Sequence, residues 1–238
     1  MFGSAIAHME DEMSDGFSKE ERAAAWWATD SRRAVSGQLY DVLREKRGEI
    51  ERADLSGIEA VRMGLIMQPA IAEIFTDLTK ISTSPLDDPG THHSQPWLRA
   101  HFDFVTEDGG LLEVKNFNAA VANKYSDMDE PMRIPDADYI QCLHEATVRN
   151  VPHVWFAVLF GGQQFRYWKL EFTPAEKEAF IQRAAQWWVK AAQAAMTVAE
   201  QQLASSQALV DQTSIASHPE VQAAAAALRD AWVAANRS

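Results

Sequence analysis

The hydrophobic and polar positions in the middle of the chain predict β-hairpins. Strand-forming side chains dominate residues 97–105 and 111–115, and the intervening Asp108, Gly109 and Gly110 are typical of a tight turn. Two further runs of this kind predict a second hairpin, at residues 154–160 and 164–171. The pattern therefore predicts a β-sheet in this part of the chain.

Apolar side chains at helical spacing predict helices on both sides of these strands. The predicted helices cover residues 18–27, 33–51, 56–78, a stretch from 136 and a stretch from 174. The first includes Trp26 and Trp27, which we expect to pack in the core. The third is expected to bury a face that carries Ile58, Val61, Leu65 and Ile71.

Two polar segments predict loops. Residues 82–94 are rich in Pro, Asp, Gly and Thr, and they contain His92 and His93. Neighbouring side chains of an extended segment point apart, so we do not expect these two histidines to share a metal ion. Residues 116–135 form a longer polar stretch that could face a substrate.

Two carboxylates and a lysine fall on the first predicted hairpin. Glu113 and Lys115 share a face of their strand because side chains alternate with a period of two, while Leu112 and Val114 point into the core. Asp103 can come close to Glu113, and two hard oxygen ligands can hold Mg²⁺ beside the Lys115 ammonium. An ion pair on an exposed strand would give the same Glu-x-Lys pattern, so the residues alone leave both interpretations open.

The charge of the chain limits how it can bind nucleic acid. Its formal net charge is −12, which argues against a protein that coats a phosphate backbone. It does not exclude a nuclease, because the distribution of charge matters more than its sum. Basic residues cluster at Arg32, Arg33, Arg44, Lys46 and Arg47. The cluster is either a local positive patch or a solvated helix face.

The length of 238 residues fits one domain in which additional elements surround the core. We expect a loose N-terminus at residues 1–17, the main domain at residues 18–194, and a helical tail rich in Ala, Gln and Ser at residues 195–238. The single cysteine, Cys142, suits a reducing cytoplasm, and we expect it to pack in a helix. The sequence has no signal or membrane-spanning pattern, so a cytoplasmic protein of a bacterium or a phage-infected host is expected.

Several segments resemble motifs of the YqaJ-type viral recombinase family, which includes the lambda exonuclease and belongs to the PD-(D/E)xK nuclease superfamily. Residues 95–100 lead into Asp103 as the family's His-Pro-x-Met-x-Ala run leads into its metal-binding Asp. Residues 134–141 resemble the family's Pro…Tyr-x-x-Gln helix, and residues 64–70 resemble its Gly-x-x-x-Glu-Pro-x-Ala helix, with Gln68 in place of Glu. The resemblance implies an α/β fold with a restriction-endonuclease-like core, in which helices flank a central mixed sheet, an N-terminal helical region precedes the core and a helical tail follows it.

The resemblance also implies roles for individual residues. The metal ligands would be Asp103, Glu113, the Val114 carbonyl and Gln68. The catalytic residues would be Asp103, Glu113, Lys115 and Gln141. The nearest matches to the residues that grip the terminal 5′ phosphate of DNA in relatives are Arg32, Arg33 and Ser36. Because an amide is neutral where the family has a carboxylate, Gln68 is expected to weaken the metal site.

The implied function is a Mg²⁺-dependent DNA exonuclease of the phage recombination type, with Mn²⁺ able to replace Mg²⁺. It would hydrolyse double-stranded DNA from its ends, in the 5′ to 3′ direction, and leave single strands for an annealing protein. The family also implies a homo-oligomer, and the lack of a membrane-spanning pattern in the sequence argues against a membrane partner. Two alternatives stay open, which are an endonuclease or nickase of the same fold, and a non-catalytic DNA-binding scaffold, the latter because of Gln68.

Overall fold

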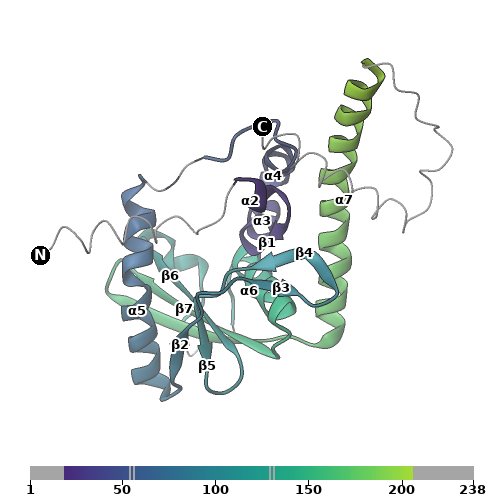
Figure 1. Ribbon diagram of the computed structural model, residues 1–238. Helices are drawn as coiled ribbons and strands as arrows, with labels where there is room; N and C mark the ends of the chain where they lie inside the picture. The colour runs from purple at the N-terminus through teal and green to yellow at the C-terminus, as the bar shows by residue number, and fades with distance from the viewer. Residues whose placement is uncertain (1–18, 54, 56, 129, 131, 206–238) are drawn as a thin grey trace, which may run out of the picture.

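The computed structural model describes a mixed α/β fold over residues 19–53, 55, 57–128, 130 and 132–205 (Figure 1). Its larger sheet has five strands in the order β2-β5-β6-β7-β8. These strands are β2 (Thr83–Pro85), β5 (Phe104–Thr106), β6 (Leu111–Phe117), β7 (His153–Phe160) and β8 (Gln164–Glu171). The β6–β7 pair is parallel, and the other pairs are antiparallel. The predicted hairpin of β7 and β8 is confirmed.

A smaller sheet has three strands in the order β1-β4-β3. They are β1 (Trp26–Trp27), β3 (Gly90–His92) and β4 (Gln95–Ala100). The predicted helix through Trp26 and Trp27 is therefore wrong, because parallel pairing with the distant β4 overrides the local helical pattern. Both indoles are buried, as expected. The predicted loop at 82–94 is also partly wrong, since β2 and β3 lie within it.

The segment expected to form one strand, at residues 97–105, is divided between the two sheets. β4 pairs in the smaller sheet and β5 in the larger one, so Asp103 lies in the break between them. The turn that follows β5 is as predicted, and Gly109 adopts a φ of 85°, which glycine tolerates without strain. The break brings the Asp103 side chain to the junction of the two sheets.

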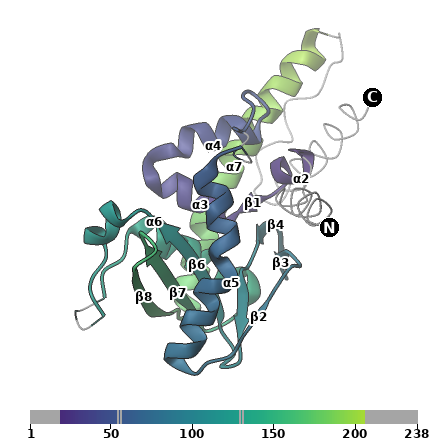
Figure 2. The same cartoon turned by 90° about the vertical axis from the view of Figure 1, so that its left-hand side faces the viewer.

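Helix α5 (Glu59–Thr79) covers one face of the larger sheet (Figure 2). Its buried side chains Ile71, Ala72 and Phe75 pack in one cluster with Leu112 and Val114 of β6. The predicted burial is wrong for the start of this apolar face, since 46%, 37% and 39% of the surface is exposed at Ile58, Val61 and Leu65. The helix packs on the sheet only along its second half.

Helix α6 (Asp136–Arg149) packs in a second core cluster with the strands of the larger sheet. It starts directly after Pro135, as predicted, and Cys142 is fully buried within it. Helix α7 (Pro174–Ser205) follows β8 and contributes Phe180 and Trp187 to the same cluster. This cluster joins the sheet, α6 and α7 into one core.

The N-terminal region is a series of short helices rather than one long helix over residues 33–51. The elements are α2 (Lys19–Ala23), α3 (Ala28–Arg33), the π-helical η1 (Ala34–Gln38) and α4 (Leu39–Lys46). Gly37 has a φ of 86°, which turns the chain between α3 and α4. A 3₁₀ turn, η2 (Ala119–Lys124), follows β6 in the predicted polar loop.

The two adjacent histidines lie together, with the ring centroids of His92 and His93 4.5 Å apart. The prediction that they point apart is wrong, because a register shift between Thr91 and His92 disturbs the alternation of side chains. The described part of the chain contains no helix long and apolar enough to span a membrane. Residues 1–17 and most of the predicted tail lie outside the described residues.

Candidate active site

Asp103 is held between α5 and the middle of β6. Its Oδ2 accepts a hydrogen bond from the Val114 backbone N–H at 2.9 Å. Its Oδ1 accepts one from Gln68 Nε2 at 3.0 Å. β5 pairs with β6 only through Phe104–Leu112 and Val105–Leu111, so the Asp103 side chain and not a strand residue takes the Val114 N–H. Gln68, Asp103 and Val114 therefore come together, although Val114 contacts Asp103 through its N–H and not through the carbonyl that was expected to bind metal.

Glu113 and Lys115 lie on the face of β6 that is opposite to Leu112 and Val114, as the alternation predicts. The Glu113 carboxylate is buried, with 4% of its surface exposed, and it accepts a hydrogen bond from Lys115 Nζ. An ion pair this deeply buried differs from one on an exposed strand edge. Of the two interpretations that the sequence left open, the exposed ion pair is wrong.

Helix α6 contributes two further polar side chains, which contact Glu113 directly or through each other. Gln141 Nε2 donates to Glu113 Oε1 at 2.6 Å and to Glu145 Oε1 at 2.9 Å. The other amide atom of Gln141, Oε1, is buried without a hydrogen-bond partner among the described residues. Glu145 was not predicted as a site residue. The available signal was its spacing of four from Gln141, which places both on one face of the helix.

The electrostatics of this cluster are dominated by a surplus of negative charge. Burial and then the charge of Glu113 raise the pKa of Asp103 well above its usual value. Burial and then Glu113 do the same to the pKa of Glu145. Burial opposes the charge of Lys115, but Glu113 and Asp103 outweigh it and hold the pKa of the ammonium above its usual range. One lysine thus faces three carboxylates, and the site favours an additional positive charge.

The residues present fit a hard divalent cation. Carboxylate, amide and carbonyl oxygens are ligands that Mg²⁺ takes, and Mg²⁺ is usually held by one or two carboxylates together with water and substrate. Asp103 and Glu113 supply two carboxylates, and the buried Gln141 Oε1 is an acceptor that still lacks a donor or a cation among the described residues. Within those residues, no three His, Cys, Asp or Glu side chains form a metal-binding group of their own. The donor set therefore suits a hard divalent cation that also takes ligands from water or substrate.

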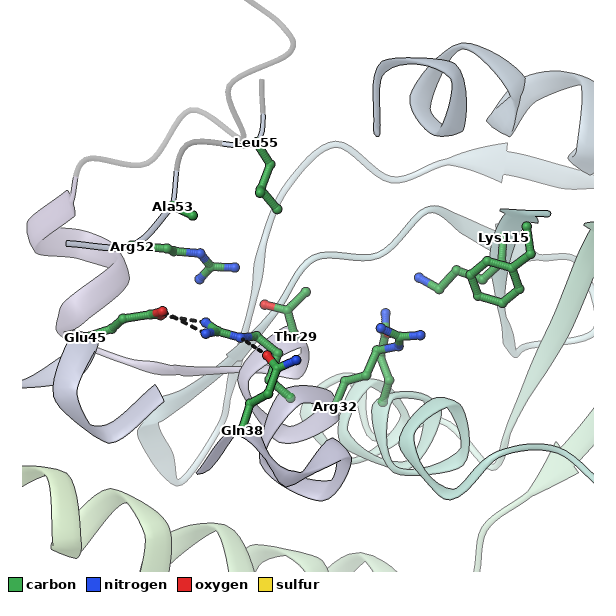
Figure 3. A pocket seen from close by; sticks show the side chains of 11 residues that line it. Thr29, Arg32, Gln38, Glu45, Arg52, Ala53, Leu55 and Lys115 are labelled. Atoms are coloured by element: carbon green, nitrogen blue, oxygen red, sulfur yellow. Dashed lines mark hydrogen bonds and ion pairs between the residues drawn. The ribbon is translucent and has the colours of Figure 1, made fainter. Parts of the chain in front are cut away.

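A pocket of about 480 Å³ opens beside Lys115 and Gln141 (Figure 3). Basic side chains of the N-terminal region line its other side, namely Arg32, Arg33 and Arg52. Arg32 and Arg33 were predicted to bind DNA, whereas Arg52 was not singled out. Ser36 is exposed, does not line this pocket, and donates its hydroxyl to the Arg32 carbonyl at 2.8 Å. The pocket thus connects the carboxylate site to a positive wall.

The sequence of residues 22–151, more than half of the chain, matches the model of the YqaJ-like viral recombinase domain. The chain belongs to the YqaJ-like viral recombinase family. This is a nuclease family, and the matched segment contains every residue of the site described above. Residues 175–238 are in addition similar to the EMRA α-helical hairpin domain. No curated protein matches the chain.

Solved structures share the fold of this YqaJ-like domain. An alkaline exonuclease from Laribacter hongkongensis has a TM-score of 0.62 at 12% identity, and the match spans 79% of this chain and 97% of that chain. Its complex with dAMP has a TM-score of 0.61 at 13% identity over the same shares. A phage-related exonuclease from Haemophilus somnus 129PT has a TM-score of 0.52 at 6% identity, over 71% and 83% of the two chains. The predicted fold class is confirmed.

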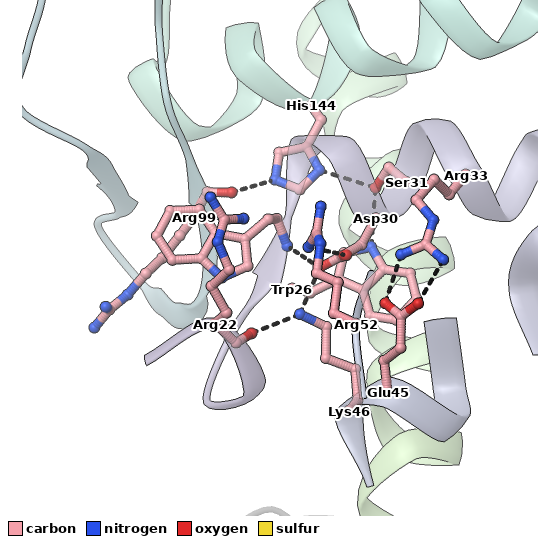
Figure 4. A network of polar contacts seen from close by, with 11 residues as sticks. Arg22, Trp26, Asp30, Ser31, Arg33, Glu45, Lys46, Arg52, Arg99 and His144 are labelled. Atoms are coloured by element: carbon pink, nitrogen blue, oxygen red, sulfur yellow. Dashed lines mark hydrogen bonds and ion pairs between the residues drawn. The ribbon is translucent and has the colours of Figure 1, made fainter. Parts of the chain in front are cut away.

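A buried chain of hydrogen bonds fixes the arginine-bearing α3 against α6 in this YqaJ-like domain (Figure 4). Burial lowers the pKa of His144 to about 3, so its ring is neutral. Its Nε2 lies 3.0 Å from the Arg99 carbonyl, which can only accept, so Nε2 carries the proton. Nδ1 then accepts from Ser31 Oγ at 2.9 Å, and that hydroxyl accepts from Trp26 Nε1 at 2.9 Å. Each donor in this series of hydrogen bonds therefore has an acceptor, and the series fixes the position of α3 relative to α6.

A buried ion pair anchors the same region. Asp30 is completely buried, and Lys46 Nζ lies 2.6 Å from its Oδ2. Burial opposes the charge of Asp30, but Lys46 outweighs it and lowers the pKa of the carboxyl. Arg52 NH1 lies 3.7 Å from the other oxygen of Asp30. Asp30 therefore ties α4 and the segment after it to α3.

Proposed function

We propose that the protein is a Mg²⁺-dependent DNA exonuclease that degrades double-stranded DNA from its 5′ ends. The observation that carries the proposal is that Lys115, which pairs with the buried Glu113 beside Asp103, lines a pocket whose other wall is basic. Carboxylates beside a lysine suit phosphodiester hydrolysis, and arginines suit the recognition of phosphate. Family membership supports a nuclease.

Mg²⁺ would be held by Asp103, Glu113 and the Val114 carbonyl, with Gln68 able to contribute its amide oxygen after rotation of the amide group. Bound there, the ion would polarise the scissile phosphate and acidify a water molecule. Mn²⁺ prefers the same oxygen ligands and is expected to substitute.

Lys115 would stabilise negative charge that develops on the phosphate. The charges of Glu113 and Asp103 outweigh burial and raise the pKa of Lys115 in the metal-free site, so the ammonium is charged there and can donate to a phosphate oxygen. Gln141 donates through Nε2 to Glu113 and Glu145, which fixes the orientation of its amide. The free Oε1 of that amide is then in place to accept from a water molecule or another donor in the site.

The basic wall supports a requirement for a DNA end. Arg32 and Arg33 line the same pocket as Lys115, so a terminal phosphate bound to them would place a nearby phosphodiester at the carboxylates. An annealing protein that receives the single strand, and a homo-oligomer, follow from the family resemblance. Light scattering of the purified protein tests the second of these.

A non-catalytic DNA-binding scaffold is the second candidate, because of one observation. Gln68 donates to Asp103 where the family's usual residue would be a carboxylate that faces the metal. A hydrogen-bonded amide lowers the negative charge of the site and therefore its attraction for Mg²⁺.

The deciding experiment compares a linear duplex with the same DNA as a covalently closed circle, in the presence of Mg²⁺. Digestion of the linear form alone, lost in Lys115→Ala, is the expected result. Digestion of both forms would indicate an endonuclease, and digestion of neither would indicate the scaffold. A label on either the 5′ or the 3′ end gives the direction.

A further inference from the structure

More cationic than acidic side chains line the pocket, although the chain as a whole is acidic. Four cationic side chains line it, from Arg32, Arg33, Arg52 and Lys115. Among the described residues that line the pocket, Glu45 is the one acid. An acid in a pocket that must attract phosphate is unfavourable for that purpose, so its presence requires an explanation.

Two of the arginines form ion pairs with acids that do not line the pocket. Arg32 Nε lies 3.0 Å from Asp138 Oδ1, and Arg52 lies 3.7 Å from Asp30. The side chains of both acids are buried, with 1% and 0% exposed, and neither acid lines the pocket. These ion pairs hold the arginines in place and leave the pocket side of each guanidinium for a ligand.

Arg33 is different because its partner lies inside the pocket. Its NH1 and NH2 contact the two carboxylate oxygens of Glu45 at 2.5 and 2.7 Å. Its Nε donates to Gln38 Oε1 at 3.1 Å. The hydrogen bond to Glu45 raises the pKa of the guanidinium, so Arg33 stays charged. The fork that fits two phosphate oxygens is thus already filled by two carboxylate oxygens (Figure 4).

The fold itself brings Glu45 to this position. The turn at Gly37 lies between α3 and α4, and Arg33 and Glu45, twelve positions apart, meet in the lining of the pocket. The side chains are 23% exposed at Arg33 and 12% at Glu45, so solvent and a ligand can still reach the pair. Because a ligand can reach this bidentate pair, a phosphate can replace the Glu45 carboxylate on Arg33.

We propose that Glu45 competes with the terminal phosphate of DNA for Arg33. Glu45 re-forms its ion pair with Arg33 whenever the phosphate leaves. The inference rests on the proposed exonuclease function and adds a release step to it. A phosphate monoester carries a charge of about −1.5 to −2 near neutral pH and displaces a carboxylate of charge −1 from the guanidinium. After each cleavage the shortened strand presents a new terminal phosphate, and the returning Glu45 keeps the previous one from being held too tightly.

The test is the affinity for a short duplex with a 5′ phosphate, measured by fluorescence anisotropy in EDTA so that no cleavage occurs. Glu45→Gln keeps the shape and removes the charge. Because ion pairs of this exposure contribute modestly, the variant should bind about three- to tenfold more tightly than the wild type. A duplex with a 5′ hydroxyl should change much less. With Mg²⁺, the steady-state turnover of Glu45→Gln should be slower than that of the wild type.

Glu49→Gln is the matched control. Glu49 pairs with Arg44 and Arg47 at 3.4 and 3.3 Å in the same region but does not line the pocket. It removes the same charge and should leave the affinity unchanged. Glu45→Asp keeps the charge but is too short for the bidentate contact, and it should give an intermediate gain. Glu45→Asp therefore still tests the inference if Glu45→Gln does not fold.

Equal affinity of the wild type and both Glu45 variants, with cleavage intact, would overturn the inference and leave the proposed function standing. Equal tightening for phosphorylated and hydroxyl ends, or the same gain in Glu49→Gln, would also overturn it, because the effect would then be one of net charge. Failure of the wild-type protein both to bind and to cleave DNA would remove the proposed function and the inference together.

Discussion

Replacing Gln68 with Glu tests whether α5 contributes to the metal site. The amide nitrogen lies 3.0 Å from Asp103 Oδ1, so the variant puts a second carboxylate at that distance. Two full charges 3.0 Å apart at an effective dielectric constant of 20 repel by about 5 kcal/mol. The hydrogen bond to a charged group that is lost contributes about 1.5–3 kcal/mol.

The measured cost should be smaller than the sum of these terms. Asp103 is partly buried and its carboxyl already has a raised pKa, so the new pair can retain a proton instead of bearing two charges. We expect Gln68→Glu to lower the free energy of unfolding by about 2–3 kcal/mol without Mg²⁺. For a chain of this length that is a fall in Tm of about 5–10 °C.

Mg²⁺ should reverse the effect, since the added carboxylate supplies a ligand. At a concentration of one hundred times Kd, a bound ion stabilises the folded state by about 2.7 kcal/mol. The assay is guanidinium unfolding with and without MgCl₂, together with calorimetric titration of the ion, in which Kd should be lower than for the wild type.

Gln182→Glu is a matched control. Gln182 also donates to a carboxylate, Glu178 Oε1 at 3.3 Å, but it is exposed on α7. It should change neither stability nor Mg²⁺ affinity appreciably. If Gln68→Glu destabilises the protein to the same extent with and without Mg²⁺, and the affinity for the ion does not change, the assignment of Gln68 to the metal site is refuted.

Three other predictions concern the site and its support. Lys115→Ala should reduce cleavage by about 10²–10⁴-fold with the circular dichroism spectrum retained, whereas Lys124→Ala should cleave normally. Asp103→Asn should lose Mg²⁺ binding, and its stability relative to the wild type should increase as pH rises. The raised pKa of the Asp103 carboxyl stabilises the wild type at low pH, and this stabilisation is lost as pH rises through the pKa of the folded state. A constant difference in unfolding free energy between the two proteins from pH 4 to pH 8 would contradict this. Phe75→Ala should cost about 3–5 kcal/mol in denaturant unfolding because the ring is fully buried, while Leu78→Ala on the same helix, which is 59% exposed, should cost little.

Much of the site could be predicted from local periodicity. The alternation of side chains places Glu113 and Lys115 on one face of β6 and Leu112 on the other, and the structure agrees. The start of α6 after Pro135 and the hairpin of β7 and β8 follow from equally local signals. In each case the residues that determine the element lie within a few positions of one another.

Other features depend on contacts between distant segments. Trp26 and Trp27 have a helical context, yet they form a strand because β4, about seventy residues later, offers a parallel partner. The division of residues 97–105 between two sheets follows from the same contact, and it is this division that frees the Asp103 carboxylate. No local pattern could reveal it.

The residues of the first predicted hairpin were compatible with a metal site, and the resemblance to a known family then indicated a nuclease and a role for Gln141. Neither could show that Glu145 completes the cluster, that Arg52 joins the basic wall, or that Glu45 fills the fork of Arg33. Those assignments depend on which helix face meets β6 and on how the chain turns at Gly37. Packing of the whole core determines both, since burial and hydrogen bonding are satisfied only when all segments are in place.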